Sequence, residues 1–402
     1  MEYKLEDLIE IKHGYAFKSE DFSEEPTRNI LLSPGNVSIG GGFNSRKKKY
    51  YREDIEVNRN YVFSNGDIFI TMTDLSKEGD TLGYPAKIPE NTNCNYLHNQ
   101  RLGKVILKNE RLIDLDYLYY LLCTREYRGY ILGTATGSTV KHTSPTKILD
   151  YKINLPELHV QKKVSSILSS LDKKILVNNK TIELLEQISQ TIFKSWFIDF
   201  EFPNEEGKPY KSSGGAMVNS ELGEIPSSFK TGNFKDILEL KYGKSLTKKN
   251  RIPGEYPVYG SGGITGTHAN YLITGPGLII GRKGSIGTLY LEFNNFYPID
   301  TVFYVESKTY EPTFLYLLFK QYDFTKSNND SAVPGLNRDF VYNTKIIIPM
   351  DNIVREFQKI ITPIYEQIEN TLLETKNLQS LRDFLLPKLI SGETKISKEL
   401  EV

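Results

Sequence analysis

Residues 160–197 read VQKKVSSILSSLDKKILVNNKTIELLEQISQTIFKSWF, and this stretch decides how the rest of the chain can fold. Its apolar side chains recur in alternating steps of four and three residues, which is the a/d pattern of a coiled coil. At about 1.5 Å per residue the stretch predicts a helical rod of roughly 55 Å. A globular domain rarely needs so long a helix, so we expect a partner helix. We call its a/d positions the seam; they are Val164, Leu168, Leu171, Ile175, Asn178, Ile182, Leu185, Ser189, Ile192 and Trp196.

A second segment of the same chain repeats this pattern, with Phe357 standing 193 positions after Val164. Each segment follows an apolar residue and a proline, Leu155-Pro156 in the first and Ile348-Pro349 in the second. Two unrelated helices, each lying on its own domain, would have to share frame, polar breaks and proline entry by coincidence. We therefore predict one antiparallel pair within the chain. The second half of the seam is Phe357, Ile361, Ile364, Ile368, Thr371, Thr375, Leu378, Arg382, Leu385 and Leu389.

The beginning of the chain is also repeated, because residues 3–17 resemble residues 234–246. Four charged or glycine positions carry the match: Asp7, Glu10, Lys12 and Gly14 correspond to Asp236, Glu239, Lys241 and Gly243. The chain is thus an internal duplication in which each half is a globular domain followed by a long helix. We predict an α+β fold: two similar α/β domains separated by two long antiparallel coiled-coil helices, with pseudo-two-fold symmetry. The expected boundaries are domain 1–156, helix 157–199, linker 200–228, domain 229–349, helix 350–392 and tail 393–402.

Composition narrows the classes of function. The 402 residues carry 50 basic and 50 acidic side chains, and no apolar run approaches the ~20 residues that span a bilayer. The N-terminal residues do not resemble a signal peptide, so we expect a cytoplasmic protein with no membrane partner. The five histidines are scattered, and the two cysteines lie too far apart for a metal knuckle and are too few for a disulfide framework. Lys244-Ser245 ends like a phosphate loop, but Leu238 occupies the position of its first glycine. We predict no catalysis, metal or cofactor in this chain.

Glycine-rich polar loops remain as functional candidates, at 256–267 and 279–288 in the second half. Glycine lets a backbone approach a ligand closely, and lysine or arginine beside exposed N–H groups suits phosphates. Each loop alone is more simply explained as a tight turn. In the first half, residues 46–51 (RKKKYY) place four cations beside two aromatic rings. Such features in both halves of a duplicated chain together favour contact with double-stranded DNA. The candidate residues are Lys12, Arg46, Lys47, Lys48, Lys49, Lys141, Lys244, Tyr259, Ser261, Gly262, Gly263, Thr265, Arg282, Lys283, Gly284 and Ser285.

Several of these segments together resemble the specificity subunit of type I restriction–modification systems. The resemblance is strongest over 155–172 (LPELHVQKKVSSILSSLD) and 193–200 (FKSWFIDF), and it extends to 257–264 (PVYGSGGI) and 280–287 (IGRKGSIG). It implies two target-recognition domains, each reading one half of a split DNA site, with the helices as a ruler between them. It also implies that the chemistry belongs to partners: two methylation subunits that use S-adenosylmethionine, and restriction subunits that use ATP and Mg²⁺.

The chain departs from the family pattern in two places. The second helix begins Asp351-Asn-Ile-Val-Arg-Glu-Phe, where the family prefers a glutamine such as Gln161 of the first helix. The first domain lacks a Tyr-Gly-Ser-Gly-Gly loop, so its DNA-facing residues are less firmly assigned.

The rod also leads to expectations about partners and register. A two-helix pair does not need Arg382 or the exposed faces at 161–163 and 183–190 for its own packing. We therefore expect methylation subunits to dock along the rod, with Phe193 and Trp196 as contacts. Asn178 should face its duplicate Thr371 at the middle of the rod.

A different class of function remains open: a non-catalytic scaffold whose rod binds only proteins. A self-contained methyltransferase is disfavoured because no cofactor motif is present.

Overall fold

The computed structural model describes residues 2–90, 93–307, 309–325 and 335–394. The chain divides into two compact units, a first unit of Met1–Leu176 with Lys376–Val402 and a second unit of Val177–Thr375. Each unit contains one globular domain and one half of each long helix, α5 (Leu158–Phe197) and α9 (Asp351–Ile390). Within the described residues, no helix is both long enough and apolar enough to cross a membrane.

The first unit is built around a four-stranded antiparallel sheet in the order β2-β10-β6-β8. Its core lies where this sheet meets α2, α3 and the start of α5. The main sheet consists of β2 (Ile9–His13), β10 (Leu102–Leu107), β6 (Ile68–Thr71) and β8 (Pro85–Lys87). A second sheet is ordered β3 (Phe22–Ser23), β5 (Tyr50–Tyr51), β4 (Asn29–Leu31) and β9 (Asn95–Leu97). Two strand pairs join β1 (Glu2–Lys4) to β12 (Lys152–Asn154) and β7 (Thr73–Asp74) to β11 (Lys141–His142). The short helices are α1 (Leu5–Leu8), α2 (Leu115–Leu122), α3 (Arg125–Thr134), α4 (Pro145–Leu149) and the 3-10 turns η1 (Ser19–Asp21), η2 (Pro34–Asn36) and η3 (Arg59–Tyr61).

The second unit has the same plan, with an antiparallel sheet in the order β16-β22-β19-β20. This sheet contains β16 (Glu239–Tyr242), β22 (Val302–Glu306), β19 (Gly277–Gly281) and β20 (Leu289–Glu292). A three-stranded sheet orders β18 (Gly263–His268), β17 (Tyr256–Gly260) and β21 (Tyr297–Pro298), while β15 (Lys230–Asn233) pairs with β23 (Lys345–Ile348). The helices are α6 (Phe234–Ile237), α7 (Pro312–Phe319), α8 (Arg338–Asn343) and the 3-10 turn η4 (Lys248–Asn250). The predicted α+β class with two similar domains and two long helices is confirmed.

The repeated opening motif has the same structural cause in both halves. The Asp7 carboxylate accepts a hydrogen bond from the backbone N–H of Lys4 at 2.9 Å, and Asp236 accepts one from Asn233 at 2.7 Å. Each carboxylate thereby caps a one-turn helix at its N-terminus. A Cβ on Gly14 would lie 2.3 Å from the carbonyl oxygen of Asn99, and one on Gly243 would lie 2.1 Å from that of Ile299. Both glycines are therefore required by a close backbone approach.

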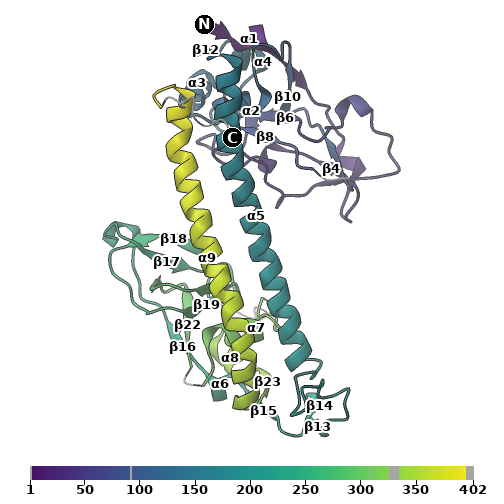
Figure 1. Cartoon of the computed structure of the whole chain (residues 1–402), viewed down its shortest axis with the longest axis vertical. Coiled ribbons are helices and arrows are strands. Elements are labelled where there is room, and N and C mark those ends of the chain that lie inside the picture. The colour runs from purple at the N-terminus through teal and green to yellow at the C-terminus, as the bar shows by residue number, and fades with distance from the viewer. Residues whose placement is uncertain (1, 91–92, 308, 326–334, 395–402) are drawn as a thin grey trace. The chain divides into compact units, whose positions relative to one another are not determined.

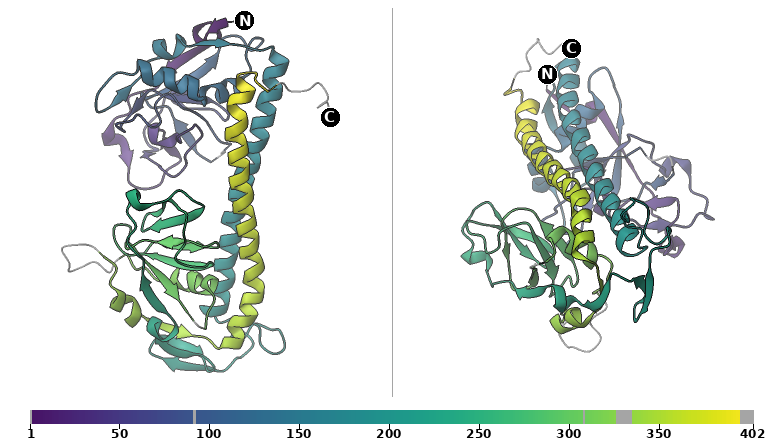
Figure 2. Two further views of the ribbon diagram at one scale, coloured as in Figure 1. Left: turned by 90° about the vertical axis from the view of Figure 1, so that its left-hand side faces the viewer. Right: turned by 60° about the horizontal axis from the view of Figure 1, so that its bottom comes forward.

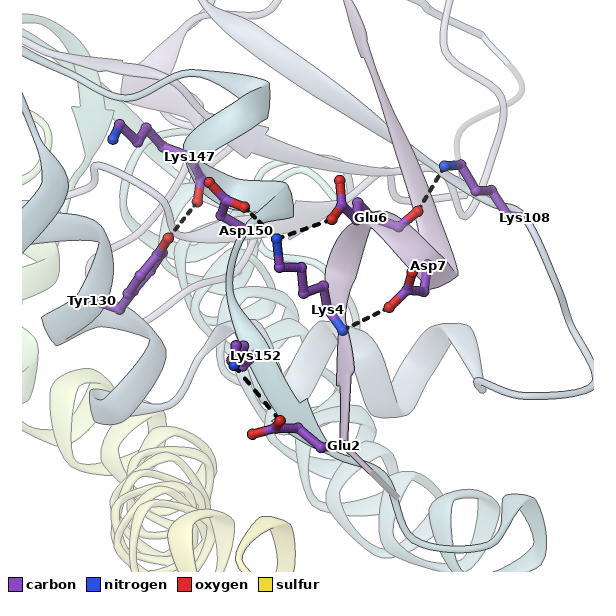
Figure 3. Close-up of polar contacts among 9 residues, drawn as sticks. All are labelled: Glu2, Lys4, Glu6, Asp7, Lys108, Tyr130, Lys147, Asp150 and Lys152. Carbon is purple, nitrogen blue, oxygen red and sulfur yellow. Dashed lines mark hydrogen bonds and ion pairs between the residues drawn. The ribbon is translucent and has the colours of Figure 1, made fainter.

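The N-terminal strand β1 ties the start of the first unit to the segment that leads into α5 (Figure 3). It pairs antiparallel with β12, and Lys4 donates to the Asp150 carboxylate at 3.0 Å while lying 3.2 Å from Glu6. These two carboxylates raise the pKa of Lys4, mainly through the hydrogen bond to Asp150. Because β12 ends four residues before α5 begins, this pairing positions the first turn of the long helix.

Within each unit, the halves of helices α5 and α9 lie side by side (Figures 1 and 2). In the first unit Val164 and Leu168 of α5 share a core with Leu389 of α9. In the second unit Trp196 packs on Phe357, with ring centroids 5.6 Å apart. In each unit the beginning of one helix meets the end of the other, so the pair is antiparallel. All the predicted seam residues are buried or half-buried.

Two polar contacts cross the seam and define its register. In the first unit, Arg382 donates to the Asp172 carboxylate at 2.9 Å. Burial alone would lower the pKa of Arg382, but the hydrogen bond and the charge of Asp172 outweigh it, so the pKa of Arg382 is raised. In the second unit, the buried Asn178 donates to the Glu374 carboxylate at 2.9 Å.

The expectation that Asn178 pairs with Thr371 is therefore wrong. The Thr371 hydroxyl bonds within its own helix instead, donating to the Gln367 carbonyl at 2.7 Å. The observed register places Asn178 level with Glu374, about one helical turn further along α9. The error arose from placing the symmetry axis at Asn178 itself rather than slightly after it.

The segment 200–228, predicted as a linker, is packed into the second unit. Phe200 and Phe202 are buried in the core of the second unit, and the Phe202 ring stacks on Phe229 at 5.2 Å and on Tyr210 at 4.6 Å. The segment then forms the hairpin β13 (Met217–Ser220) and β14 (Gly223–Pro226). The aromatic residues that stand among its prolines and glycines anchor the segment to the second unit.

We predict that Glu374→Ala lowers the free energy of unfolding by about 1–3 kcal/mol, because it leaves the buried Asn178 amide without this acceptor. Glu374→Gln keeps an acceptor and should cost much less. Thr371→Val is the matched control, since its hydroxyl bonds only within α9. Chemical denaturation measures all three, and a loss for Thr371→Val as large as that for Glu374→Ala would contradict this register.

Candidate nucleic-acid interface

In the second unit, Ser261 joins the two glycine-rich loops. Its hydroxyl donates to the carbonyl of Lys283, and its own carbonyl accepts hydrogen bonds from Thr288 at 2.7 Å and Tyr290 at 3.0 Å. Its N–H donates to the Thr301 hydroxyl at 3.3 Å. The predicted loops are therefore neighbours, as the DNA-contact hypothesis requires, and Gly284 (φ +80°) and Gly287 (φ +72°) supply the turns between them.

A tyrosine and two arginines form the cationic surface beside these loops. The guanidinium groups of Arg282 and Arg338 lie 5.0 Å and 5.5 Å from the centroid of the Tyr242 ring, which is half exposed. Arg282 is half-buried and donates to the Asp300 carbonyl at 2.6 Å, whereas Arg338 is exposed at the first turn of α8. Arginine stacked on an aromatic ring keeps its charge and its donors for a ligand.

The predicted candidates of this unit divide into supports and exposed groups. Tyr259 is buried and donates to Glu292 at 2.7 Å; burial first, and then this carboxylate, raises its pKa well above the usual value. Tyr259 and Ser261 therefore hold the loops and do not present their side chains to a ligand. The candidates that the structure leaves exposed are Lys244, Gly262, Thr265, Lys283, Gly284 and Ser285, while Gly263 is buried at φ +100°.

Tyr242 and Arg338 were missed by the sequence analysis. Tyr242 directly precedes the repeated Gly243, and Arg338 follows Asn337, whose side-chain oxygen caps α8. Neither position carries a basic run or a glycine-rich pattern. Tyr242 could have been found from its place beside the repeated Gly243, whereas no sequence signal marks Arg338.

In the first unit, Lys12 lies beside a group of aromatic rings. Its amine is 6.0 Å from the centroid of the Tyr61 ring, and Tyr61 packs on Tyr15 at 5.3 Å. Tyr15 also meets Phe17 edge to face at 5.2 Å, and nearly half of its side chain is exposed. A cation next to exposed aromatic rings is an arrangement suited to nucleic acid. Tyr15 and Tyr61 were not among the predicted site residues.

The other basic candidates of the first unit lie on separate elements. Residues 46–49 are exposed ahead of β5, with the Lys49 amine 3.7 Å from the centroid of the Phe22 ring. Lys141 is half-buried in β11, paired with Asp74 of β7. Lys12 belongs to the main sheet, residues 46–49 lie in the loop before β5, and Lys141 belongs to the two-stranded sheet, so these cations come from three separate parts of the domain.

The residues predicted to dock a partner subunit are part of the chain's own core. Phe193 has no exposed surface and Trp196 is 8% exposed. Phe193 packs on Phe314 and Phe357 with ring centroids 5.6 Å and 5.8 Å apart. We withdraw both as docking contacts, since no partner can reach a side chain that this chain already covers.

Gln161 is likewise fully buried, which corrects the expectation of an exposed face at 161–163 for this residue. It accepts from the N–H of Asp114 at 2.9 Å and donates to the carbonyls of Leu112 and Pro156 at 2.8 Å and 2.9 Å. Its role is to join the start of α5 to the start of α2, for which Asp114 is the N-cap.

The chemistry that these surfaces offer is binding. Among the described residues, no group of histidine, cysteine, aspartate or glutamate is arranged to hold a metal ion. The groups that the loops do expose are guanidinium and ammonium donors, aromatic rings and backbone N–H groups, which suit phosphates and base edges.

Comparison with known proteins places both halves of the chain in one family model. Residues 1–187 and 226–382 match the type I restriction modification DNA specificity domain. The chain is similar to the type I restriction enzyme MjaIX specificity subunit of Methanocaldococcus jannaschii, at 25% identity over 97% of this chain and 99% of that protein. It is also similar to the HindI specificity subunit of Haemophilus influenzae, at 23% identity over 72% of this chain and 79% of that protein.

A solved structure supports the fold. The S subunit of a type I restriction–modification system from M. genitalium superposes with a TM-score of 0.60. The two chains share 19% identity, and the alignment covers 99% of this chain and 96% of that one.

Proposed function

This chain belongs to the family of type I restriction modification DNA specificity subunits, and from that premise we propose that each of its globular domains reads one half of a bipartite DNA site. A specificity subunit is non-catalytic and confers the DNA target on its complex. The observation that carries the proposal is the duplication: the same family model matches both halves, and both halves have the same sheet order.

In the second unit the proposed reader is the surface of Tyr242, Arg338 and the exposed residues of the two glycine-rich loops. In the first unit it includes Lys12, 46–49 and Lys141, with Tyr15 and Tyr61 added. The arginine and lysine side chains supply phosphate contacts, which position a domain, and base-edge contacts, which specify the sequence. On this proposal α5 and α9 set the distance between the two readers.

The partners on this proposal are double-stranded DNA, two methylation subunits and restriction subunits. The methylation subunits carry S-adenosylmethionine and the restriction subunits use ATP and Mg²⁺, so the chemistry is theirs. In the second unit, the outward faces of the helices offer docking surface, because Leu184 and Ile188 of α5 and Leu373 of α9 are about half exposed. Leu184 and Ile188 stand one helical turn apart on one face.

We predict that Arg338→Gln weakens binding of the complex to its DNA by about tenfold, because a cation that contacts the duplex contributes about 1–3 kcal/mol. The salt slope, which is the slope of the logarithm of the binding constant against the logarithm of the salt concentration, should fall in magnitude by about one. Gel shifts over a salt series measure both. Lys230→Gln, which removes an exposed cation of β15 in the same unit, is the matched control. A complex in which Arg338→Gln behaves like this control would remove Arg338 from the reader.

The same experiment distinguishes the DNA reader from a protein scaffold. If the wild-type chain assembled with methylation subunits shows no binding to any duplex, then the scaffold is the better description. A steep salt dependence supports DNA recognition.

For the docking surface, we expect the double variant Leu184→Ser, Ile188→Ser to reduce co-purification of methylation subunits while leaving the melting temperature of the free chain nearly unchanged, since both side chains are already exposed. Val218→Ser, Leu222→Ser on the β13–β14 hairpin is a control of similar exposure. Undiminished assembly of the α5 variant would place docking elsewhere.

Phe193→Ala would instead destabilise the second unit by about 3–5 kcal/mol, as a large aromatic deletion in a core does.

A further inference from the structure

We infer that residues 74–82 of the first unit, here called the 74–82 loop, read bases in one half-site through the exposed side chain of Leu75. This inference rests on the proposed function and deepens it. No sequence motif singles out this loop, because it lacks the Gly-Arg-Lys-Gly pattern of its counterpart in the second unit.

Backbone hydrogen bonds identify that counterpart. Directly after β6, the N–H of Met72 donates to the Arg101 carbonyl at 2.9 Å; directly after β19, the N–H of Arg282 donates to the Thr301 carbonyl at 2.9 Å. On the other side, Thr143 donates to the Met72 carbonyl at 3.0 Å and Leu336 donates to the Arg282 carbonyl at 2.8 Å. The 74–82 loop therefore leaves the first domain at the position where the glycine-rich loop beginning at Lys283 leaves the second.

The buried carboxylate of Asp74 fixes the conformation of the loop from inside. It accepts hydrogen bonds from the N–H of Ser76 at 2.7 Å, the N–H of Thr81 at 2.5 Å and the Thr81 hydroxyl at 2.6 Å. Burial by itself would raise the pKa of Asp74, but the hydrogen bonds from Thr81 and Ser76 outweigh it and lower the pKa. The carboxylate is thus ionised and closes the loop at both ends.

Arg128 of α3 holds the far side of the loop. Its side chain is buried, both terminal nitrogens donate to loop carbonyls, those of Gly79 and Leu82, and its guanidinium lies 4.8 Å from the centroid of the Tyr84 ring. A buried guanidinium with two backbone acceptors is an expensive arrangement to leave unpaired, so the loop is kept in one conformation. A loop that is rigid before binding loses less conformational entropy when it binds.

Leu75 directly follows β7, at the start of this rigid loop, and is 66% exposed. An exposed leucine alone means little. Here, however, its neighbours Asp74 and Ser76 are hydrogen-bonded to each other within the loop. The Leu75 side chain is therefore held outward, at the position that corresponds to the candidate DNA-binding loop of the second domain. The apolar group that a leucine can meet on a base edge is the thymine methyl of the major groove.

The charges of the loop argue against phosphate binding. Its exposed charged side chains are Lys77, Glu78 and Asp80, one cation against two carboxylates. A loop with this net charge is not attracted to the phosphate backbone, so on this inference it contributes to DNA binding through contacts with particular bases. Replacement of Leu75 should therefore change sequence discrimination and leave the salt dependence unchanged.

The test uses the full chain assembled with its methylation subunits. Competition binding compares the cognate duplex, identified from the methylated sites, with duplexes that carry single base-pair changes throughout both half-sites. For Leu75→Ala we expect discrimination at one or two adjacent base pairs to fall about five- to tenfold. The loss is confined to one half-site, and the salt slope equals that of the wild type. Leu112→Ala, at 37% exposure in the same unit, is the matched control.

Each outcome decides the inference. Discrimination by Leu75→Ala equal to that of the wild type, a uniform loss at all base pairs, or a changed salt slope would overturn it. Leu75→Met, which keeps an apolar side chain of similar size, should retain most of the discrimination, and its failure to do so would also count against the apolar contact. A wild-type complex that does not discriminate among duplexes would instead overturn the proposed function.

Discussion

The antiparallel contact between α5 and α9 constrains everything else in this chain. An apolar seam alone can slip by a heptad with little loss, because one leucine layer replaces another. Two polar contacts remove that freedom: Asp172 with Arg382 in the first unit and Asn178 with Glu374 in the second. A slipped register would leave a buried amide and a half-buried guanidinium against apolar side chains, and an unpaired buried polar group costs about 1–3 kcal/mol. The function of these contacts is to choose one register, as lone polar residues do in coiled coils.

On this helical frame the two halves keep a common scaffold and vary what they expose. The scaffold comprises the capping carboxylates Asp7 and Asp236, the close-packed Gly14 and Gly243, and the antiparallel four-stranded sheets. The loops that follow β6 and β19 occupy equivalent positions, yet one is closed by Asp74 and Arg128 and the other by Ser261 and two glycines. Equivalent positions with different loop chemistry are what a duplicated reader of two different half-sites requires.

Long-range periodicity made the fold predictable, whereas side-chain contacts across the fold did not. Heptads and repeated motifs predicted the two helices and the duplication, since both depend on spacing alone. The exact register was missed because it depends on where Glu374 meets Asn178. The burial of Phe193, Tyr259 and Gln161 was missed because aromatic and amide side chains suit interfaces and cores equally well. The 74–82 loop was missed because its shape comes from Arg128, some fifty residues away in the sequence.

The central claim is that α5 and α9 set the separation of two DNA readers, and matched insertions test it most directly. One heptad would be added to α5 after Asn178 and one to α9 before Glu374, so that the seam stays paired while the rod lengthens by about 10 Å, or about three base pairs. Sequencing of methylated DNA from cells that carry the variant and its partner subunits would then report the recognised sites. The account predicts unchanged half-sites with a spacer about three base pairs longer. Unchanged half-sites with an unchanged spacer would contradict it.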